Sequence, residues 1–206
     1  MGAPRVTAQR SRPMQFSDSL SLLIDAIVGR GSQQRHGVLC RRTVMTSLAY
    51  TTTMDSPLGP ICIAGTDQGL TRVDFQHGSR PVEPLPGWQE SPGILAEAVR
   101  QIQEYFQGAR QTFSLSLAPI GTPFQQQVWQ ELQLIPFGST LTYQELAQRI
   151  GKPKGARAVG SANGCNPIAI IIPCHRVVGR DGRLRGYASG LPIKQHLLQH
   201  EGVWLL

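Results

Sequence analysis

The sequence predicts an α+β fold, in which a small antiparallel sheet with one helix precedes a mostly helical C-terminal half. Residues 48–75 alternate between apolar and polar side chains and are divided by turns rich in glycine, aspartate and proline, a pattern typical of short strands. After Gly121, apolar residues recur at helical spacing instead. No apolar run in the 206 residues approaches the ~18 needed to cross a bilayer, so we expect a soluble chain with no membrane partner.

Residues 1–46 differ in composition from the rest of the chain. The first 15 residues are rich in arginine and contain no acid, and they precede a short stretch with one apolar helical face. A transit peptide, a basic arm and upstream codons translated before a start at Met45 all fit this pattern. We expect a disordered or dispensable extension, with organelle targeting as the alternative.

The next region, residues 47–118, is predicted to be a scaffold domain. Three strand-like runs, "AYTTTM", "PICIA" and "LTRVDF", are separated by the turns "DSPLG" and "GTDQG". Ser91 and Pro92 fit an N-cap followed by proline at the first helical position. An apolar stripe then runs to Phe106 and ends at Gly108. We find no catalytic constellation in this half.

Residues 119–206 are predicted to be mostly helical. Thr122 with Gln125, and Thr142 with Glu145, each fit a capping box that opens an apolar helical stripe. Pro136 is expected to end the first helix, while Gly151 and Pro153 end the second. A third helix, "GARAVGSANG", follows after a turn of about four residues, and two short helices joined in this way form a helix-turn-helix.

The third helix is built from small residues and carries one long side chain, Arg157. A tightly packed core helix with a snorkelling arginine would have this composition. So would a helix laid in a DNA groove with its arginine directed at the base stack. The two interpretations are evenly matched on composition alone.

The run "IAIIIPCHRVVG" places Cys174 and His175 at the end of an apolar segment that reads as a buried strand. A free cysteine there is usually an inert small hydrophobe. A nucleophile would need a base, and His175 can serve only if the chain turns at Pro173 or Cys174, because strand neighbours face opposite ways. Glu201, placed against the dipole in the last turn of a helix, is our candidate to orient His175; a solvated glutamate is the alternative.

Charge and cysteine usage bear on partners and location. Residues 1–44 hold seven arginines and two acids, residues 45–120 hold four basic and seven acidic side chains, and residues 121–206 hold nine basic and four acidic ones. The basic C-terminal half indicates a polyanionic partner, although a solvated surface accounts for it equally well. The four cysteines include no C-x-x-C pair, and scattered cysteines are typical of a reducing compartment. We therefore expect a cytoplasmic protein (nucleoid-associated if bacterial) without a metal or cofactor.

Four segments in order, "GTPFQQQVW", "IPFGSTLTYQELAQRIGKPKGARAVGSANGCNP", "IPCHRVVG" and "GYASGLPIKQHLLQHEG", resemble the O6-alkylguanine-DNA alkyltransferases, the methylated-DNA–protein-cysteine methyltransferases. The close resemblance covers Gly121 to about Gly202, and a looser one reaches back to about residue 47. It implies a ribonuclease H-like N-terminal domain and a winged helix-turn-helix C-terminal domain. It also implies a monomer that flips a damaged base out of duplex DNA and needs no cofactor.

The resemblance implies roles for individual residues. Cys174 would take the alkyl group from O6-alkylguanine, and possibly O4-alkylthymine, irreversibly and once per molecule. His175 would deprotonate it through a water, Glu201 would fix the imidazole, and Asn166 would hold the turn. The other implied positions are Tyr143 (catalysis and DNA binding), Arg157, Gln144, Gly155 and Ala156 (DNA minor groove), and Val177, Tyr187 and Ser189 (base pocket).

Two departures and two rival functions accompany the resemblance. Arg185 stands where the family commonly has a small or hydroxyl residue, and Ser189-Gly190 replaces a usual Gly-Gly pair, which puts the range of accepted adducts in doubt. A binding-only alkyltransferase-like protein would lack the nucleophile that is present here as Cys174. A thiol hydrolase would explain Cys174 and His175 but not the helix-turn-helix or Arg157.

Overall fold

The computed structural model describes residues 49–76 and 88–203, and the predictions made for residues 1–46 lie outside this part. Within it, no helix is long and apolar enough to span a membrane. The cytoplasmic location and the domain boundary between residues 118 and 119 stay predictions.

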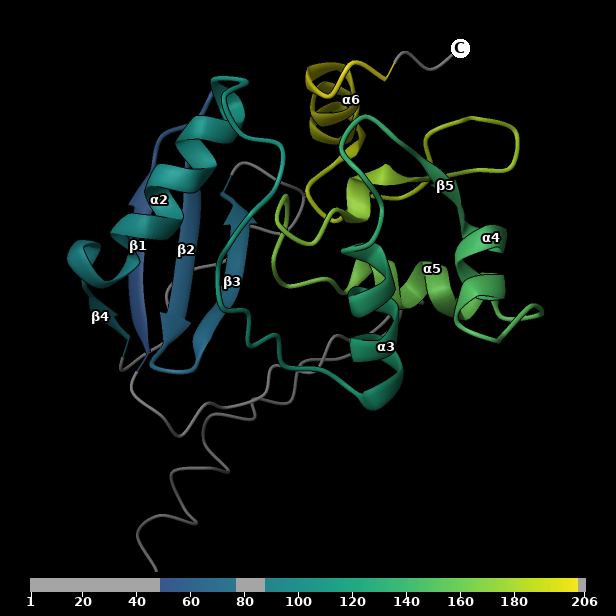
Figure 1. Cartoon of the computed structure of the whole chain (residues 1–206), viewed down its shortest axis with the longest axis horizontal. Coiled ribbons are helices and arrows are strands. Elements are labelled where there is room, and N and C mark those ends of the chain that lie inside the picture. The colour runs from purple at the N-terminus through teal and green to yellow at the C-terminus, as the bar shows by residue number, and fades with distance from the viewer. Residues whose placement is uncertain (1–48, 77–87, 204–206) are drawn as a thin grey trace, which may run out of the picture. The chain divides into compact units, whose positions relative to one another are not determined.

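The N-terminal strands form one sheet (Figure 1). Strands β1 (Tyr50–Met54), β2 (Ile61–Thr66) and β3 (Gly69–Phe75) make the predicted antiparallel meander. A fourth strand, β4 (Gln89–Glu90), pairs in parallel with β1 and gives the order β3-β2-β1-β4. The sheet is therefore mixed rather than purely antiparallel. The sequence did not indicate β4 because two residues are too short to show a period.

Helix α2 (Pro92–Phe106) lies across β1 and β2 (Figure 1). Its buried apolar residues include Leu95, and a Cβ added to Gly65 on β2 would lie 3.4 Å from the Leu95 Cδ2 atom. The tighter neighbour of that Cβ would be the Gly69 carbonyl oxygen on β3, at 3.0 Å, so the glycine mainly allows close approach of the two strands. Ser91 occupies the predicted N-cap position and Pro92 begins the helix. The Ser91 side chain, however, makes no capping hydrogen bond.

The C-terminal half contains the predicted helix-turn-helix. Helix α3 (Pro123–Leu132) begins at a complete capping box, and so does α4 (Tyr143–Arg149), while α5 (Ala156–Gly164) follows after the turn. Both boxes are confirmed in full, with the threonine side chain and the third-position side chain each bonding the opposite backbone N–H. Helix α3 ends at Leu132, before Pro136, so the proline lies beyond the helix that it was expected to terminate.

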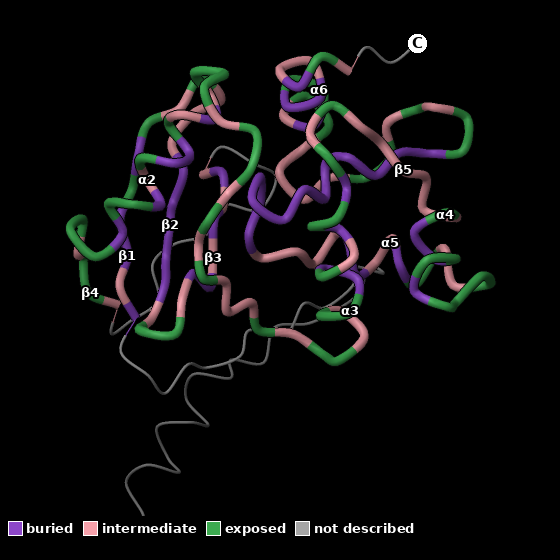
Figure 2. The backbone as a smooth tube through the Cα atoms, in the orientation of Figure 1, coloured by how far each residue is buried: buried purple, intermediate pink, exposed green. Residues whose placement is uncertain are grey.

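The apolar run Ile168–Ile172 is not a strand, contrary to the prediction. It makes one bridge to β3, where Val73 donates to the Pro167 carbonyl and accepts from the Ala169 N–H, each at 2.9 Å. It then turns, with Ile170 at a φ of 71°, a conformation that is strained for a β-branched residue. The run is apolar because all five of its residues are buried, as are most residues of β2 (Figure 2).

The chain after this run builds the remaining elements. A 3-10 turn, η1 (Cys174–Arg176), leads into β6 (Val177–Val178), which pairs in parallel with β5 (Leu141–Thr142). A loop then connects β6 to helix α6 (Leu191–His200). Cys174 thus lies at a turn between two buried segments, as a cooperating thiol and imidazole require.

Candidate functional site

Cys174 is held in place by Asn166. The asparagine Nδ2 donates to the Cys174 Sγ atom at 3.0 Å and to the Ile172 carbonyl at 2.8 Å, while its Oδ1 accepts from the Ile168 N–H at 3.0 Å. One side chain therefore both shapes the turn and contacts the sulfur. These contacts fit the role that the family resemblance implies for Asn166, which is to hold the turn.

The Cys174 thiol is only 5% exposed. Burial raises its pKa, and the hydrogen bond from Asn166 and the positive charge of Lys194 oppose the rise without cancelling it. The resting group at neutral pH is therefore a thiol, not a thiolate. Because only the thiolate is a good nucleophile, Cys174 needs a partner that removes its proton.

His175, the next residue along the chain, has the protonation state that such a partner needs. It is fully buried, and its Nε2 lies 2.8 Å from the Glu201 Oε1 atom. Burial lowers the His175 pKa despite the opposing effect of Glu201, so the imidazole is neutral at neutral pH. With the Nε2 proton donated to the carboxylate, Nδ1 keeps its lone pair. Nδ1 is buried and has no hydrogen-bond partner within the described residues, so it is free to accept a proton.

Glu201, the residue at the C-terminal cap of α6, receives donors from several elements. Arg176 donates from Nε to Oε2 at 2.8 Å and from a terminal nitrogen to Oε1 at 3.0 Å, Tyr105 donates to Oε1 at 2.9 Å, and the Gly138 N–H donates to Oε2 at 3.3 Å. Burial alone would raise the Glu201 pKa, but His175 and Arg176 outweigh burial and hold that pKa at about 2. The glutamate is thus ionised and buried against His175, and it is not a solvated side chain.

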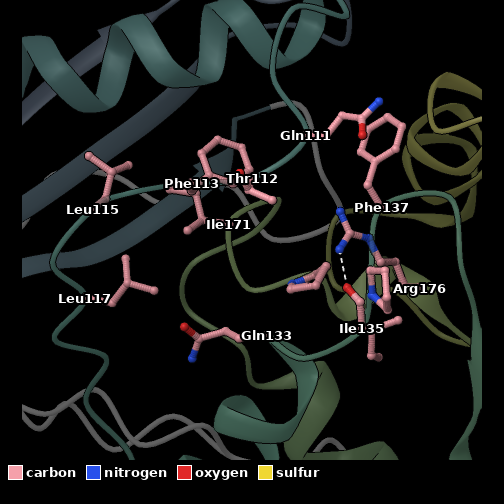
Figure 3. Close-up of a pocket in the computed structure, with 12 residues that line it drawn as sticks. Gln111, Thr112, Phe113, Leu115, Leu117, Gln133, Ile135, Phe137, Ile171 and Arg176 are labelled. Atoms are coloured by element: carbon pink, nitrogen blue, oxygen red, sulfur yellow. Dashed lines mark hydrogen bonds between the residues drawn. The ribbon is translucent and has the colours of Figure 1, made fainter.

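Arg176 neutralises this carboxylate. Its second terminal nitrogen donates to the Ile135 carbonyl, and its guanidinium carbon lies 5.9 Å from the centre of the Phe137 ring (Figure 3). A cavity of about 200 Å³ lies beside it, lined mainly by residues from 111–117 and 133–137 (Figure 3). Cys174 does not line this cavity, so it is not the place where the thiol would meet a reacting group.

Lys194 is a site residue that the sequence reasoning missed. It is 0% exposed, and its Nζ donates to the Val177 carbonyl at 2.6 Å and to the Arg185 carbonyl at 2.9 Å. Burial lowers its pKa to about 8. Helical spacing could have revealed it, because Lys194, Leu197 and Glu201 fall on one face of α6 and all three are buried.

Two tyrosines lie near the thiol. The Tyr143 hydroxyl donates to the Arg185 carbonyl at 3.1 Å, and burial, followed by the proximity of Cys174, raises its pKa to about 12. The Tyr187 hydroxyl is buried beside Cys174, and burial, followed by the proximity of Cys174, raises the Tyr187 pKa well above its ordinary value. Both phenols are therefore neutral donors at physiological pH.

Arg185, one of the two departures from the family pattern, takes part through its backbone. Its carbonyl accepts from Tyr143 and Lys194, whereas its side chain is exposed and pairs with Asp181 at 2.8 Å. Any residue can supply a carbonyl, so these two contacts do not depend on the arginine side chain. Ser189, at the second departure, is half-buried just before α6.

The predicted DNA-binding residues lie on α4, on α5 or at the N-cap of α5, and one of them, Tyr143, is also near the thiol. Arg157 is exposed on α5 and Ala156 is half-buried. A Cβ on Gly155 would lie 2.9 Å from the Lys152 carbonyl oxygen, so the turn requires glycine there. Gln144 donates to the Pro153 carbonyl at 2.7 Å and so closes the turn in the free protein. Gly160, one turn after Arg157 on α5, faces the ring of Tyr143 at the start of α4.

Of the predicted base-pocket residues, Val177 is fully buried and its carbonyl accepts from Lys194, while the buried Tyr187 hydroxyl lies beside Cys174. Within the described residues, no group of three or more histidine, cysteine, aspartate or glutamate side chains is arranged to hold a metal ion.

Family models, curated relatives and solved structures that are similar to this chain carry the name of one kind of protein. Residues 49–119 match the family model for the ribonuclease-like domain of 6-O-methylguanine DNA methyltransferase, and residues 123–203 match the model for its DNA binding domain. The methylated-DNA–protein-cysteine methyltransferase of Methanosarcina acetivorans is 51% identical over 153 residues, which cover 74% of this chain and 98% of that protein. The corresponding protein of Mycobacterium tuberculosis strain H37Rv is 47% identical over 150 residues, covering 72% and 90%. The crystal structure of Mycobacterium tuberculosis OGT in complex with DNA is similar with a TM-score of 0.69 and 45% identity, covering 74% of this chain and 92% of that one.

Proposed function

Because the chain belongs to the 6-O-methylguanine DNA methyltransferase family, it repairs alkylated DNA directly by alkyl transfer to a cysteine, and we propose that Cys174 is that cysteine. The observation that carries the assignment is the hydrogen bond from Asn166 Nδ2 to the Cys174 sulfur, and it is supported by the next residue, His175, a neutral imidazole held by an ionised glutamate. Cys62, the other free cysteine of the described residues, lies on β2 in the scaffold half.

The proposed reaction begins with loss of the thiol proton. His175 accepts it at Nδ1 through a water, and Glu201 stabilises the imidazolium that forms. Asn166 and Lys194 both favour the thiolate. Burial keeps the thiol protonated until the substrate arrives, which protects the group from adventitious alkylation.

The alkyl transfer itself is a displacement at carbon. The Cys174 Sγ atom forms a bond to the alkyl carbon while the bond from that carbon to guanine O6 breaks, and the electron pair stays on the base. Tyr143, as a neutral phenol, hydrogen bonds to the departing guanine once it releases the Arg185 carbonyl. Overall the thiol proton ends on the guanine. The product is a thioether, which no group at the site can cleave, so each molecule acts once.

The base reaches the thiol only outside the helix stack. Extrusion of one nucleotide costs roughly a few kcal/mol, and we propose that α5 enters the minor groove with Arg157 replacing the lost base. The small residues of α5 allow close approach to the sugar–phosphate backbone. Tyr143 contacts both Gly160 and the Arg185 carbonyl, so it links the groove-binding helix to the loop beside the thiol. We propose residues 47–118 as the scaffold and residues 119–206 as the domain that binds and reacts.

A duplex containing one O6-methylguanine tests this assignment. After incubation with the protein, intact mass and peptide mapping should show one added methyl group on the peptide that contains Cys174, and an unmodified duplex should give none. An unchanged mass with bound DNA would support a binding-only protein, and a methyl group on another residue would contradict the choice of Cys174.

We expect Arg157→Ala to slow transfer from duplex DNA by roughly tenfold or more, because base stacking is worth about 1–3 kcal/mol. Reaction with free O6-methylguanine base, which needs no extrusion, should keep its rate. Single-turnover rates on the two substrates measure the difference. Arg100→Ala, an exposed arginine on α2, is the matched control and should change neither rate. An equal loss on both substrates would contradict base replacement by Arg157.

We expect Lys194→Met to reduce the single-turnover transfer rate about tenfold, which corresponds to a thiol pKa raised by about one unit. The variant keeps the length of the side chain but removes the charge that favours the thiolate. DNA affinity should stay within about twofold, because Lys194 is buried. The exposed Lys152 gives the opposite control, since Lys152→Met should weaken DNA binding and leave the rate at saturating DNA unchanged.

A further inference from the structure

Tyr105 lies on α2, in the half of the chain to which the sequence assigned no catalytic role. It is 0% exposed, and its hydroxyl donates to the Glu201 Oε1 atom at 2.9 Å across 96 positions of sequence. A buried phenol is normally satisfied by a backbone carbonyl or a water. Here it is satisfied by the carboxylate that orients His175, so the scaffold half contributes a group to the reacting network.

The Glu201 oxygen that accepts the Tyr105 hydrogen bond has other donors as well. The Oε1 atom of Glu201 also receives His175 Nε2 at 2.8 Å and a terminal nitrogen of Arg176 at 3.0 Å. Donors on one oxygen compete, because each withdraws charge from the atom that the others need. The Tyr105 bond therefore weakens the hold of Glu201 on the His175 proton and fixes the direction of the carboxylate at the same time.

Tyr105 is itself held on several sides. Its backbone carbonyl accepts from His200 Nε2 at 2.6 Å, and the two rings lie 4.9 Å apart. The rings of Phe113 and Phe137 lie 5.7 and 6.2 Å from the tyrosine ring. A hydroxyl on so constrained a ring has one available position, which is beside Glu201.

We propose that Tyr105 is a positioning residue for the proton transfer: it orients Glu201 and sets how strongly the carboxylate retains the proton on His175. The proposal rests on the assignment of His175 as the base for Cys174. It gives the N-terminal domain a direct part in the chemistry, in addition to its packing against the C-terminal half.

The charged and titratable groups that face this network are few. Glu201, Arg176 and Lys194 act on His175, and Arg176 with Glu201 acts on Tyr105. His200 contacts the Tyr105 ring and backbone, and Tyr187 lies near enough to Tyr105 to interact with it electrostatically. None of these is altered when only the Tyr105 hydroxyl is removed, so a change in the titration of His175 can be attributed to that hydroxyl.

Tyr105→Phe in the full chain is the test, with the single-turnover transfer rate measured from acidic to neutral pH. The acidic limb of this pH–rate profile reports the pKa of the His175 imidazole, because the imidazole must be neutral to accept a proton. Without the phenol, Glu201 retains the imidazolium proton more strongly, so this limb should move to higher pH by about 0.5–1 unit. Replacing Tyr105 by 3-fluorotyrosine, a stronger donor of the same shape, should move the limb in the opposite direction.

Two controls separate this role from packing. Phe113→Leu perturbs the same aromatic cluster and should lower stability without moving the acidic limb of the pH–rate profile. Tyr50 is a half-buried tyrosine on β1, and Tyr50→Phe should change neither the stability nor the acidic limb. A Tyr105→Phe profile that superimposes on the wild type, or fluorotyrosine and phenylalanine variants that shift the same way, would overturn the proposal. If the wild-type protein transfers no methyl group to Cys174, the underlying assignment fails instead, and the two failures are distinct.

Discussion

Replacing Cys174 by alanine is expected to abolish methyl transfer from O6-methylguanine DNA while leaving affinity for the duplex within about twofold. The other free cysteine of the described residues, Cys62, lies on β2, so it cannot replace Cys174 as the acceptor in the proposed reaction. The thiol is 5% exposed, and DNA binding of this kind rests on phosphate contacts and helix insertion. Loss of the sulfur should therefore separate chemistry from binding.

The matched control for this variant is Cys62→Ala, which removes the other free, buried cysteine of the described residues. It should transfer a methyl group at the wild-type rate. Intact mass after incubation measures transfer, and fluorescence anisotropy of a labelled duplex measures binding. Residual methylation of Cys174→Ala, or a loss of DNA affinity comparable to the loss of transfer, would refute the assignment.

Glu201→Gln is expected to have the largest combined effect on rate and stability. The amide keeps the shape of the side chain but leaves the buried Arg176 guanidinium without a counter-charge, and breaking a buried ion pair on one side costs about 3–5 kcal/mol. His175 also loses the group that fixes its tautomer and stabilises the imidazolium. We expect single-turnover transfer to fall by a factor on the order of 10²–10⁴, as in other systems where an orienting carboxylate becomes an amide.

The stability loss should depend on pH in a defined direction. The folded state holds the Glu201 pKa at about 2, against a usual value of 4.5. A lowered carboxyl pKa stabilises the folded state fully above the unfolded value, and this contribution is lost as pH falls through the folded one. Wild type and Glu201→Gln should therefore differ most above about pH 4.5 and converge toward about pH 2.

Denaturant unfolding at a series of pH values measures this convergence. Glu97→Gln, at an exposed carboxylate paired with Arg100 on α2, is the control and should change stability little at any pH, since exposed ion pairs contribute little. A difference for Glu201→Gln that is independent of pH would mean that lost packing, and not lost charge, destabilises the variant.

Local signals in the sequence predicted local features well. The capping boxes at Thr122 and Thr142 are confirmed because a threonine and a polar residue three positions later satisfy each other within one turn. Glu201 could be singled out because a glutamate at the C-terminal end of a helix is locally unfavourable. In each case the physical cause lies within a few residues of its effect.

Features that depend on distant residues could not be predicted in this way. Tyr105 looked like one more apolar position of an amphipathic stripe, and its partner Glu201 lies 96 residues away. The run Ile168–Ile172 has the composition of a buried strand, yet Asn166 and the packing of the two halves turn it. Lys194 was overlooked because a lysine in a helix is usually solvated, although its helical face was already marked by Leu197.

The position of α6 in the chain has a consequence for incomplete molecules. Cys174, our proposed nucleophile, lies on η1, whereas Lys194 lies on α6, the last helix of the described part, and Glu201 caps the end of that helix. A polypeptide interrupted before α6, by a premature stop or by a protease, would still carry Cys174 and His175. It would lack the glutamate that holds the imidazole in place. Such a fragment could retain the groove-binding helix and still be chemically silent, so reactivity is reserved for chains whose synthesis has passed this point.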